Sequence, residues 1–157
     1  MACLQEDLKE EVDFVLTFEE LQGIFEAREI DFSKIDAPED LTDSTALGRG
    51  FAAAGGVSAA VLDIIKRNYP DADVRVETAD GLKECRTLLA LAKAGKMDGC
   101  LLEGMACKGG CINGAGTIIS ADTAKKRLQE HMAQAENESC AEGAYSGLAG
   151  HLEKPKA

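Results

Sequence analysis

Two cysteines, Cys107 and Cys111, are the residues whose type and spacing point most directly to chemistry. Thiolates are soft ligands that suit iron–sulfur clusters, zinc and copper(I). Gly109 and Gly110 lie between the two thiols, and Gly114 follows shortly after them. Without side chains at these positions the backbone can wrap closely around a bulky group, and its amides can donate hydrogen bonds to cluster sulfides. The pattern predicts a metal-binding loop that suits an iron–sulfur centre.

Other interpretations of this loop stay open from the residues alone. One is a glycine-rich turn with two incidental cysteines, and another is a zinc-binding or dithiol redox site. Zinc favours four ligands in a compact pattern, whereas His131 and His151 lie far along the chain and form no spaced pair with a cysteine. Six cysteines in a chain that we expect to stay inside the cell favour metal or redox chemistry over a disulfide framework.

The remaining cysteines are weaker candidates. Cys85 lies on the apolar stripe of an expected helix and Cys100 lies within an expected strand, so we predict that both are structural thiols. Cys140 falls in the C-terminal segment, where we expect it to be free or recruited as a further ligand.

Alternating strand and helix patterns must position the cysteine loop. The expected elements, in chain order, are residues 12–16, 18–28, 57–68, 73–77, 80–94, 99–103 and 121–134. The first, fourth and sixth are strands, and strands separated by such helices are typical of a parallel α/β sheet flanked by helices. Ligands gather at the carboxyl ends of such strands, and the cysteine loop directly follows the strand 99–103. We expect a domain over residues 1–134 and a mobile tail over 135–157.

Local signals define the ends and faces of these helices. Thr17 and Glu20 have the spacing of a capping box, and Asp80 and Ser120 are the expected N-caps of two later helices. Residues 31–56 read as a polar loop that ends in glycines. The apolar stripes expected to be buried on the first and third helices are Phe18, Leu21, Ile24 and Phe25, and Leu82, Cys85, Leu89 and Ala92.

Composition excludes several classes of function. The chain has 157 residues, enough for one domain, and its formal net charge is -11, which disfavours nucleic acid as a partner. No apolar stretch approaches the ~20 residues that a membrane-spanning helix needs. The first residues lack the basic start and apolar run of a secretory signal, so we expect a cytoplasmic protein without a membrane partner.

The cysteine loop also carries a family resemblance. Residues 103–114 read Glu-Gly-Met-Ala-Cys-Lys-Gly-Gly-Cys-Ile-Asn-Gly. This stretch resembles the third signature of iron-only hydrogenases, Glu-x-Met-Ala-Cys-x-x-Gly-Cys-x-x-Gly, which is long and specific. Residues 12–21 are similar to the strand–helix entry of the same lobe, and residues 48–57, with Gly55 and Gly56, to the loop before its next helix. In all, about residues 8–134 follow the order of the C-terminal lobe of the two-lobed hydrogenase active-site domain.

The resemblance implies roles for individual residues. Cys107 would bind the [4Fe–4S] part of the active-site H-cluster, and Cys111 would bridge this cubane to a di-iron subcluster. Met105 would line the di-iron pocket, and Glu103 would belong to the proton route that reaches it. The glycines at 55, 56, 109, 110 and 114 would contact the cofactor.

The sequence also departs from the family pattern. The first signature, Thr-Ser-Cys-Cys-Pro, which supplies a cubane ligand and the proton-relay cysteine, is absent. The second has Pro-Cys and then a Lys three residues on. Here Cys3 stands at the cysteine position and Glu6 at the lysine position. Cys3 is therefore either a third ligand or a chance terminal cysteine.

Three functions follow as hypotheses. The first is a lobe of a hydrogenase that interconverts protons and dihydrogen when paired with a second lobe or subunit, with a ferredoxin-like electron carrier as a further partner. The second is an iron–sulfur module without hydrogen chemistry, serving assembly, electron transfer or sensing. The third is a dithiol or zinc-binding module that uses Cys107 and Cys111. The missing signatures predict that the isolated chain is inactive as a hydrogenase.

Overall fold

The computed structural model describes residues 10–35, 44–143 and 147. The chain forms two compact units. Unit 1 comprises Met1–Pro38 and Ala115–Ile119, and unit 2 comprises Glu39–Gly114 and Ser120–Ala157. In the part of the chain that the structure describes, no helix is long and apolar enough to cross a membrane.

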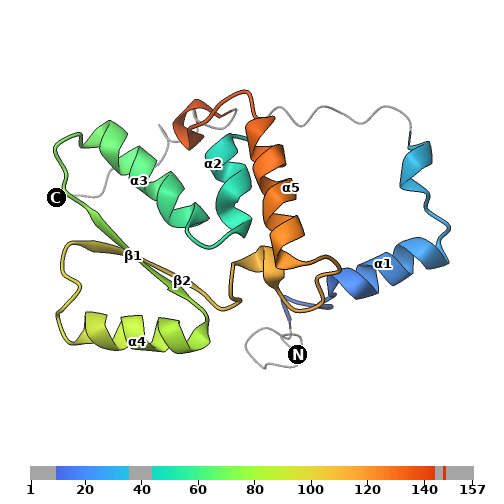
Figure 1. The fold of residues 1–157 in the computed structure, drawn as a ribbon, viewed down its shortest axis with the longest axis horizontal. Coiled ribbons are helices and arrows are strands. Elements are labelled where there is room, and N and C mark those ends of the chain that lie inside the picture. Colours follow the sequence, from blue (N-terminus) through green and yellow to red (C-terminus); the bar gives the residue numbers. More distant parts are fainter. Residues whose placement is uncertain (1–9, 36–43, 144–146, 148–157) are drawn as a thin grey trace. The chain divides into compact units, whose positions relative to one another are not determined.

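Unit 2 is built on a βαβ element (Figure 1). Strand β1 (Arg75–Asp80) leads into helix α4 (Leu82–Lys93), which returns the chain to strand β2 (Cys100–Met105). The two strands pair in parallel, with their first residues opposite each other and their last residues opposite each other. Parallel neighbours need a crossover of this kind. The predicted parallel sheet is confirmed.

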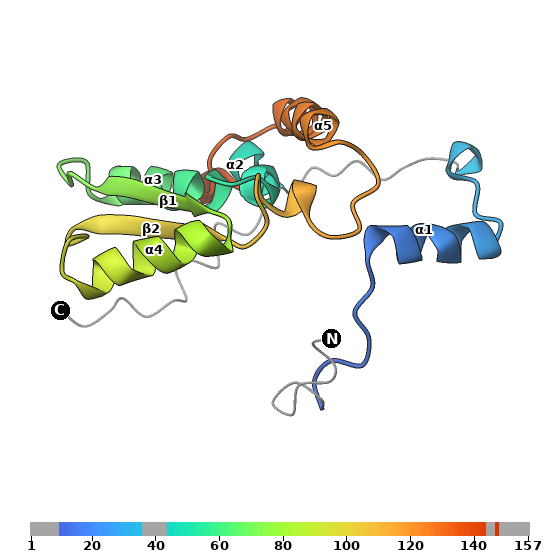
Figure 2. The same ribbon diagram turned by 60° about the horizontal axis from the view of Figure 1, so that its bottom comes forward.

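Helices flank this sheet. Helix α4 packs against β1 and β2, and helix α3 (Gly56–Asn68) contacts β2 from the other side, so that the strands lie between the two helices in Figure 2. Helix α2 (Ala46–Arg49) packs against α3 and against α5 (Ala121–Ala133). The predicted α/β class, a parallel sheet flanked by helices, is therefore confirmed.

The strand predictions were partly wrong. Strands β1 and β2 reach two or three residues further toward their carboxyl ends than expected. The backbone N–H of Gly81 donates to the carbonyl of Met105 over 2.8 Å, which keeps the two chains paired to that point. The strand expected at 12–16 is absent, because these residues pair with no strand among the residues described. Phe14 there is 83% exposed.

Two of the three predicted helix caps are confirmed. Thr17 and Glu20 form the reciprocal capping box of helix α1 (Phe18–Ala27), and Ser120 accepts the N–H of Thr123 at the start of α5. The cap predicted at Asp80 was wrong. Gly81 is the N-cap of α4 and Asp80 is the last residue of β1, which leaves the Asp80 carboxylate for another partner.

The predicted buried face of α4 was rotated by about one residue. Cys85 and Ala92 are half-buried as expected, but Leu82 and Leu89 are 69% and 65% exposed. Leu88, which was not on the predicted stripe, is half-buried instead. The buried apolar residues of the described chain are all small, namely Ala60, Ala79 and Ala124.

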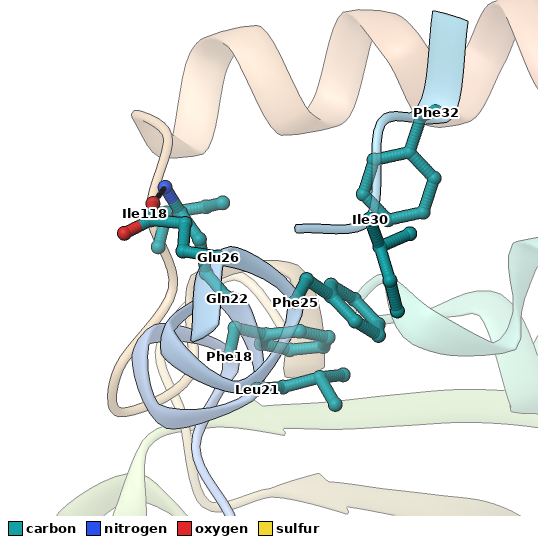
Figure 3. A pocket seen from close by; sticks show the side chains of 8 residues that line it. All are labelled: Phe18, Leu21, Gln22, Phe25, Glu26, Ile30, Phe32 and Ile118. Atoms are coloured by element: carbon teal, nitrogen blue, oxygen red, sulfur yellow. Dashed lines mark hydrogen bonds between the residues drawn. The ribbon is translucent and has the colours of Figure 1, made fainter. Parts of the chain in front are cut away.

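Helix α1 of unit 1 buries none of its residues, contrary to the expectation for its apolar stripe. Instead, Phe18, Leu21 and Phe25 of this stripe line an open groove of about 450 Å³ (Figure 3). The rings of Phe25 and Phe32, the latter in a short 3₁₀ helix (Phe32–Lys34), meet edge to face with centroids 5.1 Å apart. The groove lining comprises Phe18, Leu21, Gln22, Phe25, Glu26, Ile30, Phe32 and Ile118.

The region expected to be a polar loop, residues 31–56, contains short helical turns in addition to α2. The beginning of the expected tail is also packed. The N–H groups of Ala46 and Leu47 donate to the carbonyls of Asn137 and Glu138 over 2.8 and 3.0 Å. Ser139 is fully buried. Its hydroxyl donates to the Asp63 carboxylate and lowers the pKa of Asp63. Residues 148–157 lie outside the described chain.

Candidate metal centre at the end of the sheet

The cysteine loop leaves the sheet at its carboxyl edge. Met105 ends β2 directly opposite Asp80, the last residue of β1, and the loop begins at once. Because both strands end at this level, the loop can be held by both. The sequence predicted the cysteine loop at this edge of the sheet.

The middle of the loop is bound to the rest of unit 2 by backbone groups. The N–H of Gly109 donates to Oδ1 of Asp80 over 2.7 Å, and its carbonyl accepts the N–H of Ala54 over 3.2 Å. Gly110 forms an antiparallel bridge with Ala53. The part of the loop between the two cysteines is therefore held by the segment before α3 and by the end of β1.

Hydrogen bonds within the loop curl it around these glycines. The N–H of Gly110 donates to the carbonyl of Cys107 over 2.9 Å, and the N–H of Gly114 donates to that of Cys111 over 3.1 Å. The side-chain amide of Asn113 reaches the carbonyl of Lys108 over 2.9 Å. The two cysteines thus flank one tight turn, and Cys111 opens a 3₁₀ turn that ends at Asn113.

The two thiols of the loop differ in exposure. Cys111 is exposed and Cys107 is half-buried, and both are free. A Cβ atom at Gly114 would lie 3.7 Å from Sγ of Cys107, so the absence of a side chain at this position leaves the sulfur uncovered on that side. Two free thiols on one glycine turn fit a soft metal centre.

Glu103 lies two residues before the end of β2 and is buried. Its Oε1 accepts the N–H of Gly55 over 3.1 Å, and its Oε2 accepts the N–H of Ser58 over 3.2 Å and also the Ser58 hydroxyl. The carboxylate thus binds the N-terminus of α3, where N–H groups lack partners within the helix and the helix dipole favours an anion. Glu103 therefore links β2 to the N-terminus of α3.

Comparison with known proteins agrees with this geometry. The family model of the iron-only hydrogenase large subunit, C-terminal domain, matches residues 2–115, most of the chain. The chain belongs to this family. The match contains the whole cysteine loop and also Cys3, and it ends before α5, earlier than the expected resemblance over residues 8–134. Membership makes the chain part of an oxidoreductase family and implies iron–sulfur cofactors.

Several glycines of this hydrogenase domain lie at positions where a side chain would be strained or would overlap the backbone. Gly109 and Gly110 have φ of 87° and 94°, and Gly55, the N-cap of α3, has φ of 87°, values that side chains rarely allow. A Cβ atom at Gly56 would overlap the carbonyl of Gly50. These glycines shape the loop and the corner that holds it. Their direct contact with a cofactor stays a prediction.

Met105 is half-buried, and its carbonyl accepts the N–H of Gly81 and the Cys85 thiol, the latter over 3.5 Å. Since alternate residues of a strand share a face, Met105 projects to the same face of β2 as Glu103. A Cβ atom at Gly104, on the opposite face, would lie 3.1 Å from Sγ of Cys85. The role of Met105 beside a di-iron unit stays a prediction.

Among the residues described, the other cysteines do not join Cys107 and Cys111. Cys85 and Cys100 are half-buried, in keeping with structural thiols, and Sγ of Cys140 lies 3.5 Å from the Thr45 hydroxyl. Among the residues described, no group of three or more His, Cys, Asp or Glu could hold a metal ion. Cys3 lies outside the described residues.

Sequence reasoning missed Asp80, Ala53 and Ala54, which hold the loop, and Ser58, which binds Glu103 of β2. The signal for Asp80 was its position at the carboxyl end of a strand, the edge where the loop was already expected. Ser58 stands three residues after Gly55, in the first turn of a helix whose N-cap has no side chain. Such an N-terminus needs an acceptor from elsewhere, and Glu103 supplies it.

Proposed function

We propose that this hydrogenase domain binds an iron–sulfur cluster of the H-cluster type through Cys107 and Cys111. The proposal includes a [4Fe–4S] cubane and a di-iron subcluster. When bound, this cofactor supplies the redox chemistry that interconverts two protons and two electrons with dihydrogen. The observation that carries the proposal is the pair of free thiols, one exposed and one half-buried, on a glycine turn at the carboxyl edge of the sheet.

The ligand count supports an incomplete site. A protein-bound cubane uses four thiolates as a rule, and the described loop supplies Cys107 and Cys111. In this proposal Cys3 is a third ligand and another chain supplies the rest. The family match includes Cys3, in keeping with this assignment.

The chain's own residues would act around the cluster in distinct ways. Cys111, the exposed thiol, would bridge toward the di-iron unit, and Met105 would present an apolar thioether to it. Glu103 is proposed for the proton route. Its carboxylate accepts three hydrogen bonds from Gly55 and Ser58, which hold it in place on the proposed route.

A second hydrogenase lobe or subunit is the proposed partner, with a ferredoxin-like electron carrier as a further one. Exposed apolar side chains support a missing neighbour in unit 2, because Leu82 and Leu89 stand on one face of α4 and are both largely exposed. A cytoplasmic location, where thiols stay reduced, is part of the proposal.

Anaerobic reconstitution of the purified chain with iron and sulfide tests the cluster. We expect a brown, labile cluster with the absorption and Mössbauer signature of a cubane, and its loss in the double variant Cys107→Ser plus Cys111→Ser. The matched control is Cys85→Ser plus Cys100→Ser, which changes two cysteines outside the loop and should keep the cluster. Equal cluster content in both double variants would contradict the assignment.

Hydrogen evolution with a reduced electron donor tests the need for a partner. After di-iron loading, we expect the isolated chain to be inactive or nearly so, because the relay cysteine and the di-iron-contacting lysine of the family are missing. Addition of a chain that carries Thr-Ser-Cys-Cys-Pro should raise activity, because it supplies the relay cysteine. Robust turnover by the single chain would show that the second lobe is dispensable.

An iron–sulfur module without hydrogen chemistry is the second candidate. Glu6 at the lysine position of the second signature favours it, because a carboxylate there would repel an anionic di-iron unit instead of binding it. Infrared bands of iron-bound carbon monoxide and cyanide in the loaded chain would decide against this candidate.

A further inference from the structure

We propose that Asp80 is a positioning residue that sets the separation of the Cys107 and Cys111 thiolates. It does so through the hydrogen bond between its carboxylate and the backbone N–H of Gly109. The inference rests on the proposed function, since it assigns Asp80 a role toward the cluster that these cysteines would bind.

Gly109 is the point at which the loop is fixed from two sides. Its N–H binds Asp80 and its carbonyl binds the N–H of Ala54, so both of its backbone polar groups have partners outside the loop. Its φ of 87° reverses the chain between the two cysteines. Whatever holds Gly109 therefore controls the turn that joins the thiols.

Asp80 binds the loop instead of capping α4. An Asp just before a helix usually caps it, yet the N-cap of α4 is Gly81, with no side-chain hydrogen bond at that helix start. The carboxylate reaches across to the loop, where the 2.7 Å distance to Gly109 is that of a short charge-assisted hydrogen bond.

Asp80 acts through the backbone and not on the metal. Its side chain lines a cavity of about 310 Å³ together with Gly109, Asn113, Asp122 and Lys125. Neither Cys107 nor Cys111 lines this cavity.

The first experiment uses the reduced full-length chain without iron, and phenylarsine oxide as a probe that bridges two neighbouring thiols. Peptide mapping follows the bridging of Cys107 to Cys111 in wild type, Asp80→Asn and Asp80→Ala. A hydrogen bond to a charged acceptor contributes about tenfold or more to an equilibrium, so bridging by Asp80→Ala should weaken about tenfold. Asp80→Asn keeps an acceptor oxygen and should stay within about threefold of wild type. Asp98→Ala, which removes an exposed carboxylate two residues before β2, is the matched control.

The second experiment uses the reconstituted chain. Asp80→Ala should lose its cluster to a chelator about tenfold faster than wild type and show altered g values in the electron paramagnetic resonance of the reduced cluster. Asp80→Asn should restore both, and Asp98→Ala should leave both unchanged. Should Asp80→Ala not fold, Asp80→Glu, which displaces the carboxylate by one methylene, takes its place with the same expected direction.

The outcomes separate this inference from the proposed function. A wild-type chain that takes up no cluster defeats the proposed function, and the arsenical experiment then decides the inference alone. Wild-type bridging by Asp80→Ala overturns the inference. An equal loss in Asp80→Ala and Asp98→Ala also overturns it, because it shows only a general loss of stability.

Discussion

Glu103 on β2 and Ser58 on α3 are bound twice, because one carboxylate oxygen accepts both the backbone N–H and the hydroxyl of the serine. The other oxygen accepts the N–H of Gly55, the N-cap of the same helix. This contact joins the strand that leads into the cysteine loop to the helix whose preceding segment holds the loop. A carboxylate in the family signature thus has a structural role in addition to any part in proton transfer.

Replacement of Glu103 separates these two roles. We expect Glu103→Ala to lower the free energy of unfolding by about 2–3 kcal/mol, because the buried donors of Ser58 and the half-buried N–H of Gly55 lose their acceptor. Glu103→Gln keeps one acceptor oxygen and should cost about 1 kcal/mol. Urea denaturation measures both. If Glu103→Ala unfolds at the wild-type urea concentration, the contact does not stabilise the fold.

Gly114→Ala should affect the cluster more than the fold. The backbone at Gly114 has φ of -71°, which alanine adopts readily, but the new Cβ would lie 3.1 Å from the carbonyl oxygen of Cys111 and 3.7 Å from Sγ of Cys107. We expect iron per chain after reconstitution to be roughly halved or lower, because the methyl group fills space beside the sulfur. Gly23→Ala in α1, where nothing lies within 4 Å, is the control and should keep full iron content.

Gly55 and Gly56 should differ in their sensitivity to alanine. Gly55→Ala should cost about 1–2 kcal/mol, because its positive φ strains a side chain while nothing else lies within 4 Å. Gly56→Ala should cost about 2 kcal/mol or more, because the Cβ would overlap the carbonyl of Gly50. Thermal unfolding of the iron-free chain checks the order. The reverse order would indicate that the corner relaxes around a new side chain.

The contact between Ser139 and Asp63 should make stability depend on pH in the acid range. The hydroxyl of Ser139 lowers the pKa of Asp63 below its ordinary value of 3.8, with a further contribution from Arg67. A carboxyl group whose pKa is lower in the folded chain stabilises that chain above its unfolded pKa, and the effect is lost as pH falls through the folded pKa. Ser139→Ala should therefore unfold at lower urea than wild type at pH 7 and 5.

This difference should shrink below pH 3.8, where the carboxyl of Asp63 becomes protonated. Asp63→Asn, which cannot ionise, supplies the control, since its response to Ser139→Ala should not vary with pH. A difference between wild type and Ser139→Ala that stays constant from pH 7 to pH 3 would contradict the prediction.

Signals confined to a few neighbouring residues were predictable from the sequence. The capping box of Thr17 and Glu20 and the cap at Ser120 need only local spacing, and both form as predicted. The parallel strands and the position of the cysteine loop followed from the alternation of strand and helix patterns. Each of these patterns is also visible in a short stretch of sequence.

Features that depend on distant partners were not predictable. Asp80 resembled a helix cap because its competing partner, Gly109, lies 29 positions away. Residues 12–16 have the composition of a strand, but a strand requires a neighbour with which to exchange hydrogen bonds. The partners of Glu103 likewise come from a helix 45 positions earlier in the chain.

The two strands have equal length, and their register fixes the position of the cysteine loop. Asp80 and Met105 stand side by side only in the observed register. Successive strand residues face opposite sides, so a slip of β2 by one residue would turn Glu103 toward α4 and Gly104 toward α3. Such a slip would release α3 from the strand and at the same time carry Gly109 away from Asp80. Insertions in the turns that flank α4 should therefore be tolerated, whereas a single inserted residue inside β2 should detach the loop.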